Sequence, residues 1–150
     1  MLSLLLQSAA VIWASPYSLL GLSIGLLGLA TGGRARFRPR VIEFHGGAVK
    51  GFVSMLPGRP FIMAITFGHT ILGQTGAALD IARDHEMVHV RQYERWGPVF
   101  GPAYLLCSVL LWLRGKDPYR ENPFERQAFS EVPHPILHAC EGSTAASGQR

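Results

Sequence analysis

The chain contains few charged residues and few cysteines. Only 16% of its 150 residues are Asp, Glu, Lys or Arg, whereas soluble globular proteins carry about 25%. Because disordered chains combine high charge with low hydrophobicity, and 48% of this chain is hydrophobic, disorder of the whole chain is excluded. Cys107 and Cys140 do not form a metal-type pair, and free thiols are typical of a reducing compartment.

Charge is missing altogether from the first 33 residues, which contain no Asp, Glu, Lys, Arg or His. Since about 20 apolar residues cross a bilayer, we assign residues 1–33 as a membrane anchor, in which Pro16 kinks one helix or separates two short ones. Gly21 and Gly25 form a Gly-x-x-x-Gly pattern, through which membrane helices approach closely. We therefore expect contact with membrane lipid, and either self-association through these glycines or their exposure to lipid.

Four basic residues follow the anchor at once: Arg34, Arg36, Arg38 and Arg40. Lys and Arg beside a membrane helix stay cytoplasmic, so we expect the remaining chain on the cytoplasmic side. The other ten basic residues balance the ten acidic ones, so the net charge of +4 reflects this cluster. The sequence has no basic helix with interleaved aromatics and no nucleic-acid motif, which argues against nucleic acid as a partner.

The remaining sequence predicts one domain at residues 34–131 and a flexible tail at 132–150. A β-hairpin is expected over residues 41–53, because apolar and polar residues alternate and two adjacent glycines suit its turn. A third strand is expected at 61–66, extended through a bulge at Gly68. This strand lies either in the middle of the sheet or at an edge, where an extended peptide could add to it.

Three helical segments follow the strands. A helix over 80–96 is stopped by a Gly-Pro pair, and a last helix begins at Asn122, an N-cap residue ahead of Pro123. Between them, residues 98–113 are apolar throughout. A helix of that length rises about 24 Å, less than the hydrocarbon core of about 30 Å. We therefore expect this segment to lie behind the 80–96 helix or to dip into the membrane interface.

The strongest chemical signal is a His-Glu-x-x-His pattern formed by His85, Glu86 and His89. Residues four apart lie on one face of a helix, so the two imidazoles can bind one zinc ion. Glu86 is then placed beside the metal, where it can act as a general base on water. The pattern indicates a metal-dependent hydrolase; the alternative is two surface histidines with a glutamate between them.

A catalytic zinc needs a third protein ligand. Glu125 is the preferred candidate, because it occupies the third helical position after Asn122 and lies far enough downstream for a helix to return. In the alternative interpretation Glu125 is only part of a capping box with Asn122. Glu121, in the loop before the helix, is the reserve candidate. The other histidines lie in the tail or near predicted strands: His45, His69, His134 and His138.

The segments around these residues, at 84–94 and 122–128, resemble the gluzincin branch of the zincin metallopeptidases. More locally they resemble small bacterial membrane-associated proteins of the minigluzincin type, over roughly residues 40–130. The resemblance implies an α+β fold in which a small, mainly antiparallel sheet packs on an active-site helix, an apolar helix and a glutamate helix. It also implies a location at the bacterial inner membrane.

The resemblance further implies Zn2+ bound by His85, His89 and Glu125, with Glu86 as the general base. Many gluzincins have an Asp four residues after the ligand Glu, which orients the first histidine. This chain departs from that pattern, because Phe129 occupies the position.

The expected function is therefore that of a membrane-anchored zinc metallopeptidase acting on a peptide or protein substrate. Tyr119 and His69 are candidate donors to the oxyanion, and packing or strand-end roles are their alternatives. A non-catalytic zinc-binding regulatory or scaffold protein is the first alternative function, since little chain is left to build a substrate cleft. A membrane assembly protein without metal is the second.

Overall fold

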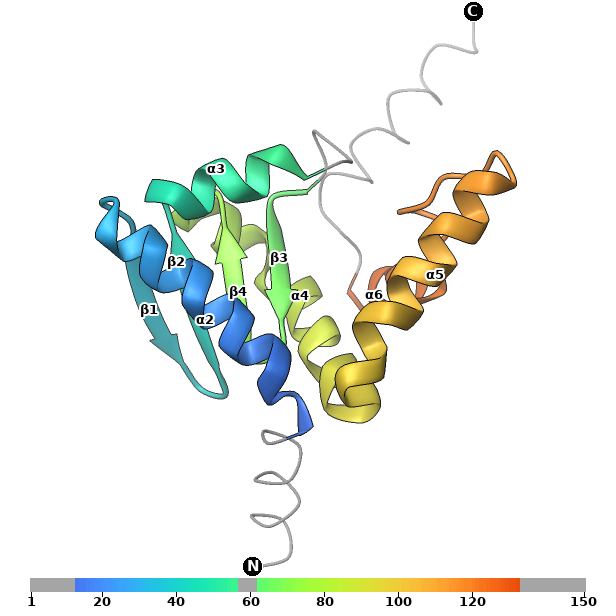
Figure 1. The fold of residues 1–150 in the computed structure, drawn as a ribbon, viewed down its shortest axis with the longest axis horizontal. Helices are drawn as coiled ribbons and strands as arrows, with labels where there is room; N and C mark the ends of the chain where they lie inside the picture. Colours follow the sequence, from blue (N-terminus) through green and yellow to red (C-terminus); the bar gives the residue numbers. More distant parts are fainter. Residues whose placement is uncertain (1–12, 57–61, 133–150) are drawn as a thin grey trace, which may run out of the picture.

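The computed structural model describes residues 13–56 and 62–132. Within them the chain forms a mixed four-stranded sheet with helices on both faces, so the expected α+β class is confirmed (Figure 1). Residues 1–12, 57–61 and 133–150 lie outside the described part of the chain. The beginning of the expected anchor, the beginning of the expected third strand and nearly all of the expected tail therefore lie outside the described residues.

The strands lie side by side in the order β1 (Arg34–Arg38), β2 (Val41–His45), β4 (Thr70–Gly73) and β3 (Ala64–Phe67). β1 and β2 pair antiparallel, as do β3 and β4, whereas the central pair of β2 and β4 is parallel. The sheet is therefore mixed, and the expected continuous third strand is a hairpin of two strands. β3 occupies one edge of the sheet, which decides between the two positions expected for this strand.

The expected hairpin after β2 is wrong in its second half, because the chain forms helix α3 (Gly47–Met55) instead. Gly46 and Gly47 both have positive φ, 78° and 50°, and reverse the chain at the end of β2. Val49 and Val53, four residues apart, then face the sheet and are fully buried. The apolar residues here follow the helical period, and the crossover frees β2 to pair in parallel with β4.

β1 lies within the arginine cluster, and the sequence analysis does not predict it. The strand pairs with β2 along its whole length, from Arg34 opposite His45 to Arg38 opposite Val41. Ion pairs join three of the arginines to carboxylates of the same fold: Arg36 to Asp80, Arg38 to Glu43 and Arg40 to Glu94. The cluster is thus largely part of the folded domain.

Helix α2 (Ser15–Ala30) packs across the sheet, so the expected N-terminal transmembrane helix is not confirmed (Figure 1). Its buried positions are Gly21, Gly25 and Gly28. A Cβ at these positions would overlap, in turn, Phe67 and Thr70, the Phe44 ring, and Val49. The glycines therefore let α2 approach its own sheet and α3. The face on which Gly21 and Gly25 were expected to meet a second copy is buried inside the fold.

We expect Gly25→Ala to lower the free energy of unfolding by about 1–3 kcal/mol, because the added methyl group overlaps the Phe44 ring in a packed core. Gly51→Ala is the matched control: it lies in helix α3 with no neighbouring atom in the way, and alanine favours a helix. Thermal unfolding of the detergent-solubilised chain measures both. Equal melting temperatures for the two variants would show that α2 is not held against the sheet.

The sheet separates two hydrophobic layers. On one face, α2 and α3 cover a cluster built on Phe44 and Leu72. On the other face, helix α4 (Gly76–Trp96) covers Ile71 and Val41. Successive residues of one strand point to opposite faces, so neighbours such as Ile71 and Leu72 belong to different layers.

The C-terminal helices complete the layer on the α4 side. A 3-10 turn (Gly97–Val99) leads from α4 into α5 (Phe100–Leu113), and α6 (Pro123–Glu131) returns to pack along α4. These elements confirm the three expected helices. In the described part of the chain, the continuous helical run Gly76–Leu113 is the one segment that is long and apolar enough to cross a membrane by length and composition.

Candidate metal centre

Helix α4 presents three functional side chains on its buried side. Its N-terminus is capped by the Thr75 hydroxyl, which accepts a hydrogen bond from the backbone N–H of Ala78. His85, Glu86 and His89 are only 3%, 6% and 7% exposed. Buried polar groups of this kind need partners, so the side chains that surround them define the site.

The main partner is Glu125, in the first turn of α6. One carboxylate oxygen lies 3.1 Å from His85 Nε2 and the other lies 3.3 Å from His89 Nε2. The three side chains thus offer two nitrogens and one oxygen, all within 4.8 Å of one another and all buried. His85, His89 and Glu125 are close enough to bind one metal ion.

The two carboxylates expected as the third ligand lie in different surroundings. The Asn122 side chain caps α6 by accepting a hydrogen bond from the Phe124 N–H, and the Glu125 carboxylate faces the histidines and Tyr104. Glu121 pairs with Lys116 at the surface, 3.1 Å away. Glu125 therefore lies in the buried cluster with the two histidines, and Glu121 lies at the surface.

His89 and Glu125 stabilise each other's charged forms. Burial alone raises the pKa of Glu125, but hydrogen bonds from His85 and His89 outweigh burial and lower this pKa to about 2. Burial lowers the pKa of His89, but the Glu125 carboxylate outweighs it and raises the pKa to about 9. At neutral pH the metal-free site therefore holds a carboxylate and a protonated imidazole.

A metal must displace the His89 proton, because only a neutral imidazole binds metal. We expect roughly one proton to be released per Zn2+ bound at pH 7, and Zn2+ affinity to rise as the pH is raised towards 9. Isothermal titration in two buffers of different ionisation enthalpy measures the proton count. A binding enthalpy that is the same in both buffers would contradict this expectation.

Gln92 fixes the orientation of His89, and the sequence analysis does not identify it as a site residue. Its amide oxygen lies 2.8 Å from His89 Nδ1; since this oxygen can only accept, Nδ1 donates and Nε2 faces Glu125. The Gln92 amide nitrogen donates to the Phe124 carbonyl and to Gln127, which ties α4 to α6. The available signal was its position, three residues after His89 on one helix face.

We expect Gln92→Leu to weaken Zn2+ binding by about 10–100-fold, the usual cost of losing a group that orients a metal-binding histidine. Gln127→Leu is the matched control, because it removes one hydrogen bond between α4 and α6 and leaves His89 untouched. Competition with a fluorescent zinc chelator gives both affinities. An equal loss in the two variants would mean that Gln92 acts only through packing of the helices.

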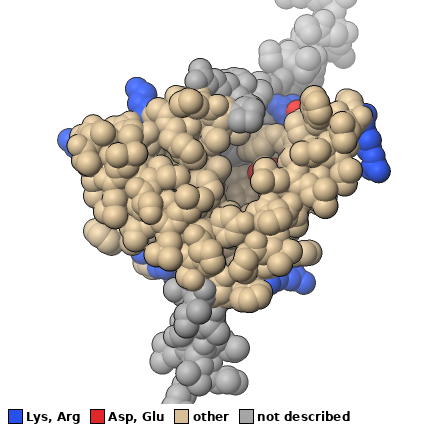
Figure 2. Space-filling model, in the orientation of Figure 1, with Lys and Arg blue, Asp and Glu red and all other residues tan. Residues whose placement is uncertain are grey.

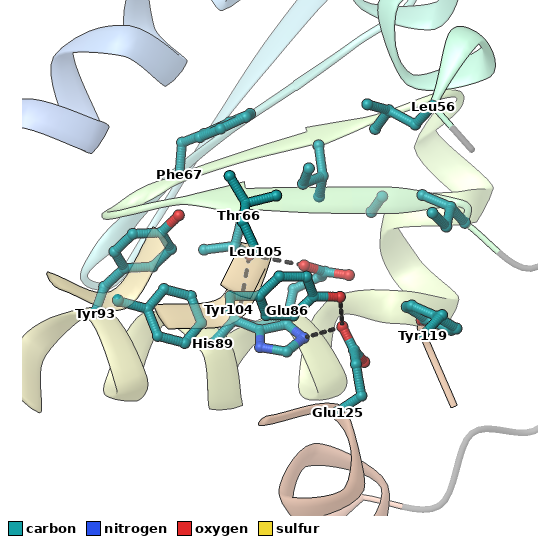
Figure 3. Close-up of a pocket in the computed structure, with 14 residues that line it drawn as sticks. Leu56, Thr66, Phe67, Glu86, His89, Tyr93, Tyr104, Leu105, Tyr119 and Glu125 are labelled. Atoms are coloured by element: carbon teal, nitrogen blue, oxygen red, sulfur yellow. Dashed lines mark hydrogen bonds and ion pairs between the residues drawn. The ribbon is translucent and has the colours of Figure 1, made fainter. Parts of the chain in front are cut away.

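The Glu86 side chain lines a pocket beside the cluster formed by His85, His89 and Glu125 (Figure 3). The Thr66 hydroxyl, on edge strand β3, donates a hydrogen bond of 2.8 Å to the Glu86 carboxylate. The pocket has a volume of about 310 Å³ and is lined mainly by apolar side chains from β3, α4 and α5. Glu86 thus shares a cavity with His89 and Glu125, and the Thr66 hydroxyl positions its carboxylate.

Two tyrosines reach Glu125 from other elements. Tyr104, on α5, donates a hydrogen bond of 2.7 Å to its carboxylate, and the sequence analysis does not identify this residue. Burial and the Glu125 carboxylate raise the pKa of Tyr119, so its hydroxyl stays protonated and can donate. Both line the pocket. His69, the other expected donor, instead bonds Glu94 and lies outside the residues that line it.

The departure at Phe129 is visible in the structure. The Phe129 ring packs against the His85 imidazole, with ring centroids 4.8 Å apart. The residue four positions after Glu125 therefore places an apolar ring, and not a carboxylate, against His85.

The donor set itself fits a transition metal. Imidazole nitrogens suit zinc, copper, iron and nickel, and two histidines with one glutamate form a common ligand set of catalytic zinc. No protein family, no curated protein and no solved structure matches this chain.

Proposed function

We propose that this chain is a membrane-associated, zinc-dependent peptidase of the bacterial inner membrane with its site on the cytoplasmic side. His85, His89 and Glu125 hold the zinc ion, and Glu86 is the general base. The observation that supports this best is the placement of Glu86: its carboxylate faces a pocket next to the ligand cluster and is positioned by Thr66.

The ligand number supports catalysis over a structural role. Structural zinc sites are usually closed by four protein ligands, whereas catalytic sites use three and leave a position open. Among residues 13–56 and 62–132, three side chains that could bind one metal ion converge. A purely structural zinc site does not require a general base such as Glu86 beside its ligands.

Each residue of the pocket then has a chemical task. Bound zinc polarises a substrate carbonyl and makes water more acidic. Glu86, aligned by the Thr66 hydroxyl, accepts the proton of the attacking water and passes it to the leaving amine. Tyr119, protonated at neutral pH, is available to donate a hydrogen bond to the oxyanion.

The site also constrains the membrane topology. His85 and His89 precede the apolar α5 and Glu125 follows it, yet the three side chains meet in one cluster. The chain therefore enters and leaves α5 on the same side of any bilayer, although the run that ends with α5 is long and apolar enough to cross one. We place α5 at the membrane interface.

The test is metal content and peptide cleavage of the full-length chain in detergent. We expect about one zinc ion per chain, and cleavage of an apolar peptide library, read by mass spectrometry, that stops on adding a strong chelator and returns with Zn2+. Stoichiometric zinc without any cleavage would favour the non-catalytic zinc protein. A chain that binds no zinc would exclude both.

A further inference from the structure

Large apolar side chains are exposed on α2 and α5, two helices without a single charged residue. On α2 these include Leu19, Leu26 and Leu27, which are 54–62% exposed. On α5 they include Leu105, Leu106 and Trp112, which are 60–67% exposed. A helix that is apolar on all sides belongs in a protein core or in lipid. The fold buries one side of α2 but only Phe100 of α5, and the exposed apolar surface of both helices needs a further apolar partner.

Both helices border the same face of the molecule. Figure 2 shows this face as almost free of charged atoms, with Lys and Arg confined to its outline. In the sequence, basic residues lie next to these helices: Arg34 follows α2 by four residues, and Arg114 comes directly after α5. An apolar surface bordered by positive charge complements a bilayer with anionic headgroups. A second copy would instead bring a border of the same charge against it.

The metal pocket opens on this face. Figure 2 shows a hollow between α5 and the sheet, with an acidic atom visible inside it. Leu105 lines the pocket and is nevertheless 64% exposed, so this side chain belongs both to the pocket mouth and to the apolar surface. Leu56 also lines the pocket, and its neighbour Met55 is 82% exposed. The apolar lining of the pocket is therefore continuous with the exposed apolar surface at Leu105.

We propose that the face formed by α2 and α5 lies in the interfacial layer of an anionic bilayer, with the mouth of the metal pocket open to lipid. α2 and α5 lie along the membrane surface, because α2 packs on the sheet and α3, and hydrogen bonds of Tyr104 tie α5 to Glu125 and Asn122. The pocket then receives an apolar segment of a membrane-embedded protein. This substrate class rests on the peptidase activity proposed above, whereas the position of the face does not.

The position of the face is tested with nitroxide labels on the full-length chain. The background is Cys107→Ser with Cys140→Ser, and single labels are attached after Leu27→Cys, Leu105→Cys or Leu106→Cys. Ile81→Cys is the matched control, an exposed apolar residue of α4 on the other side of the sheet. The chain is reconstituted in vesicles of phosphatidylcholine and phosphatidylglycerol. Because the uncharged first residues can hold the chain on vesicles by themselves, the measurement is label position and not binding.

We expect oxygen, which concentrates in lipid, to relax the labels at 27, 105 and 106 more than a water-soluble nickel complex does, and the reverse at 81. Labels at 105 and 106 that respond mainly to nickel would overturn the proposal. So would labels shielded from both reagents, which indicate a protein partner, or a label at 81 that also lies in lipid. His89→Ala is expected to give the same pattern, since insertion does not need the metal.

The substrate class has its own readout. In the same vesicles, the wild-type chain should cleave a peptide carrying a reconstituted apolar helix faster than the same peptide lacking that helix. Equal cleavage of both peptides would overturn the substrate class. If neither is cleaved, the proposed peptidase activity fails, and the labels still decide where the face lies.

Discussion

Glu86→Gln is expected to abolish peptide cleavage while leaving the metal in place. Glutamine keeps the shape of the side chain and its contact with Thr66 but cannot accept a proton from water. General-base catalysis contributes about 10²–10⁴-fold to rate, so cleavage should fall by at least about 100-fold. Metal content should stay equal to that of the wild type, because the carboxylate of Glu86 is not part of the ligand cluster.

Asp84→Asn is the matched control for this experiment. It makes the same carboxylate-to-amide change two residues away on α4, at an exposed position. Cleavage rate and zinc per chain are measured for both variants on the same preparation. Loss of zinc in Glu86→Gln, or a cleavage rate equal to that of Asp84→Asn, would remove Glu86 from the role of base.

The residues that could be predicted from the sequence are those set by local geometry. His85 and His89 share one helix, so a spacing of four fixes their common face whatever else surrounds them. Asn122 and Pro123 mark a helix start, and this placed Glu125 in a first turn without any knowledge of the fold. That α6 returns to α4 was expected only because a metal needs a third ligand.

Most of the site residues that the sequence did not predict contact residues far from them in the chain. Thr66 donates a hydrogen bond to Glu86 because the sheet packs against α4. Tyr104 donates a hydrogen bond to Glu125 from α5, a helix whose sequence is apolar throughout. Neither contact leaves a periodic pattern in the sequence. Gln92 is different, since it lies on the same helix as the histidines and its spacing carried a readable signal.

The wrong strand at residues 48–53 and the unconfirmed membrane anchor at the N-terminus have one physical origin. A short apolar stretch fits either a strand or a helix, and only tertiary packing decides between them. Residues 48–53 became a helix because Val49 and Val53 together cover the sheet. Likewise, the uncharged N-terminal stretch looks the same whether lipid or protein surrounds it. The close contact of Gly25 with Phe44 shows that protein covers one side of it.

Glu125→Ala is expected to remove the metal, and Glu121→Ala to leave it bound. Glu125 supplies the only carboxylate of the described cluster, and its loss leaves two histidines on one helix as ligands. Loss of a group that merely orients a ligand weakens binding by about 10–100-fold, so loss of the ligand itself should exceed about 100-fold. Metal binding that is absent in the unfolded chain adds to folding stability, so the melting temperature should fall as well.

Glu121→Ala deletes a carboxylate of the same type four residues earlier, from a surface pair with Lys116. Zinc per chain and the melting temperature, each with and without a strong chelator, are measured for both variants and for His89→Ala. Glu125→Ala and His89→Ala should match the chelated wild type and show no further response to chelator. If Glu121→Ala loses zinc and Glu125→Ala retains it, the ligand assignment is reversed. If the chelator leaves the wild-type melting temperature unchanged, the cluster holds no metal that matters to the fold, and the contacts of Glu125 with the two buried histidines are then made without a metal.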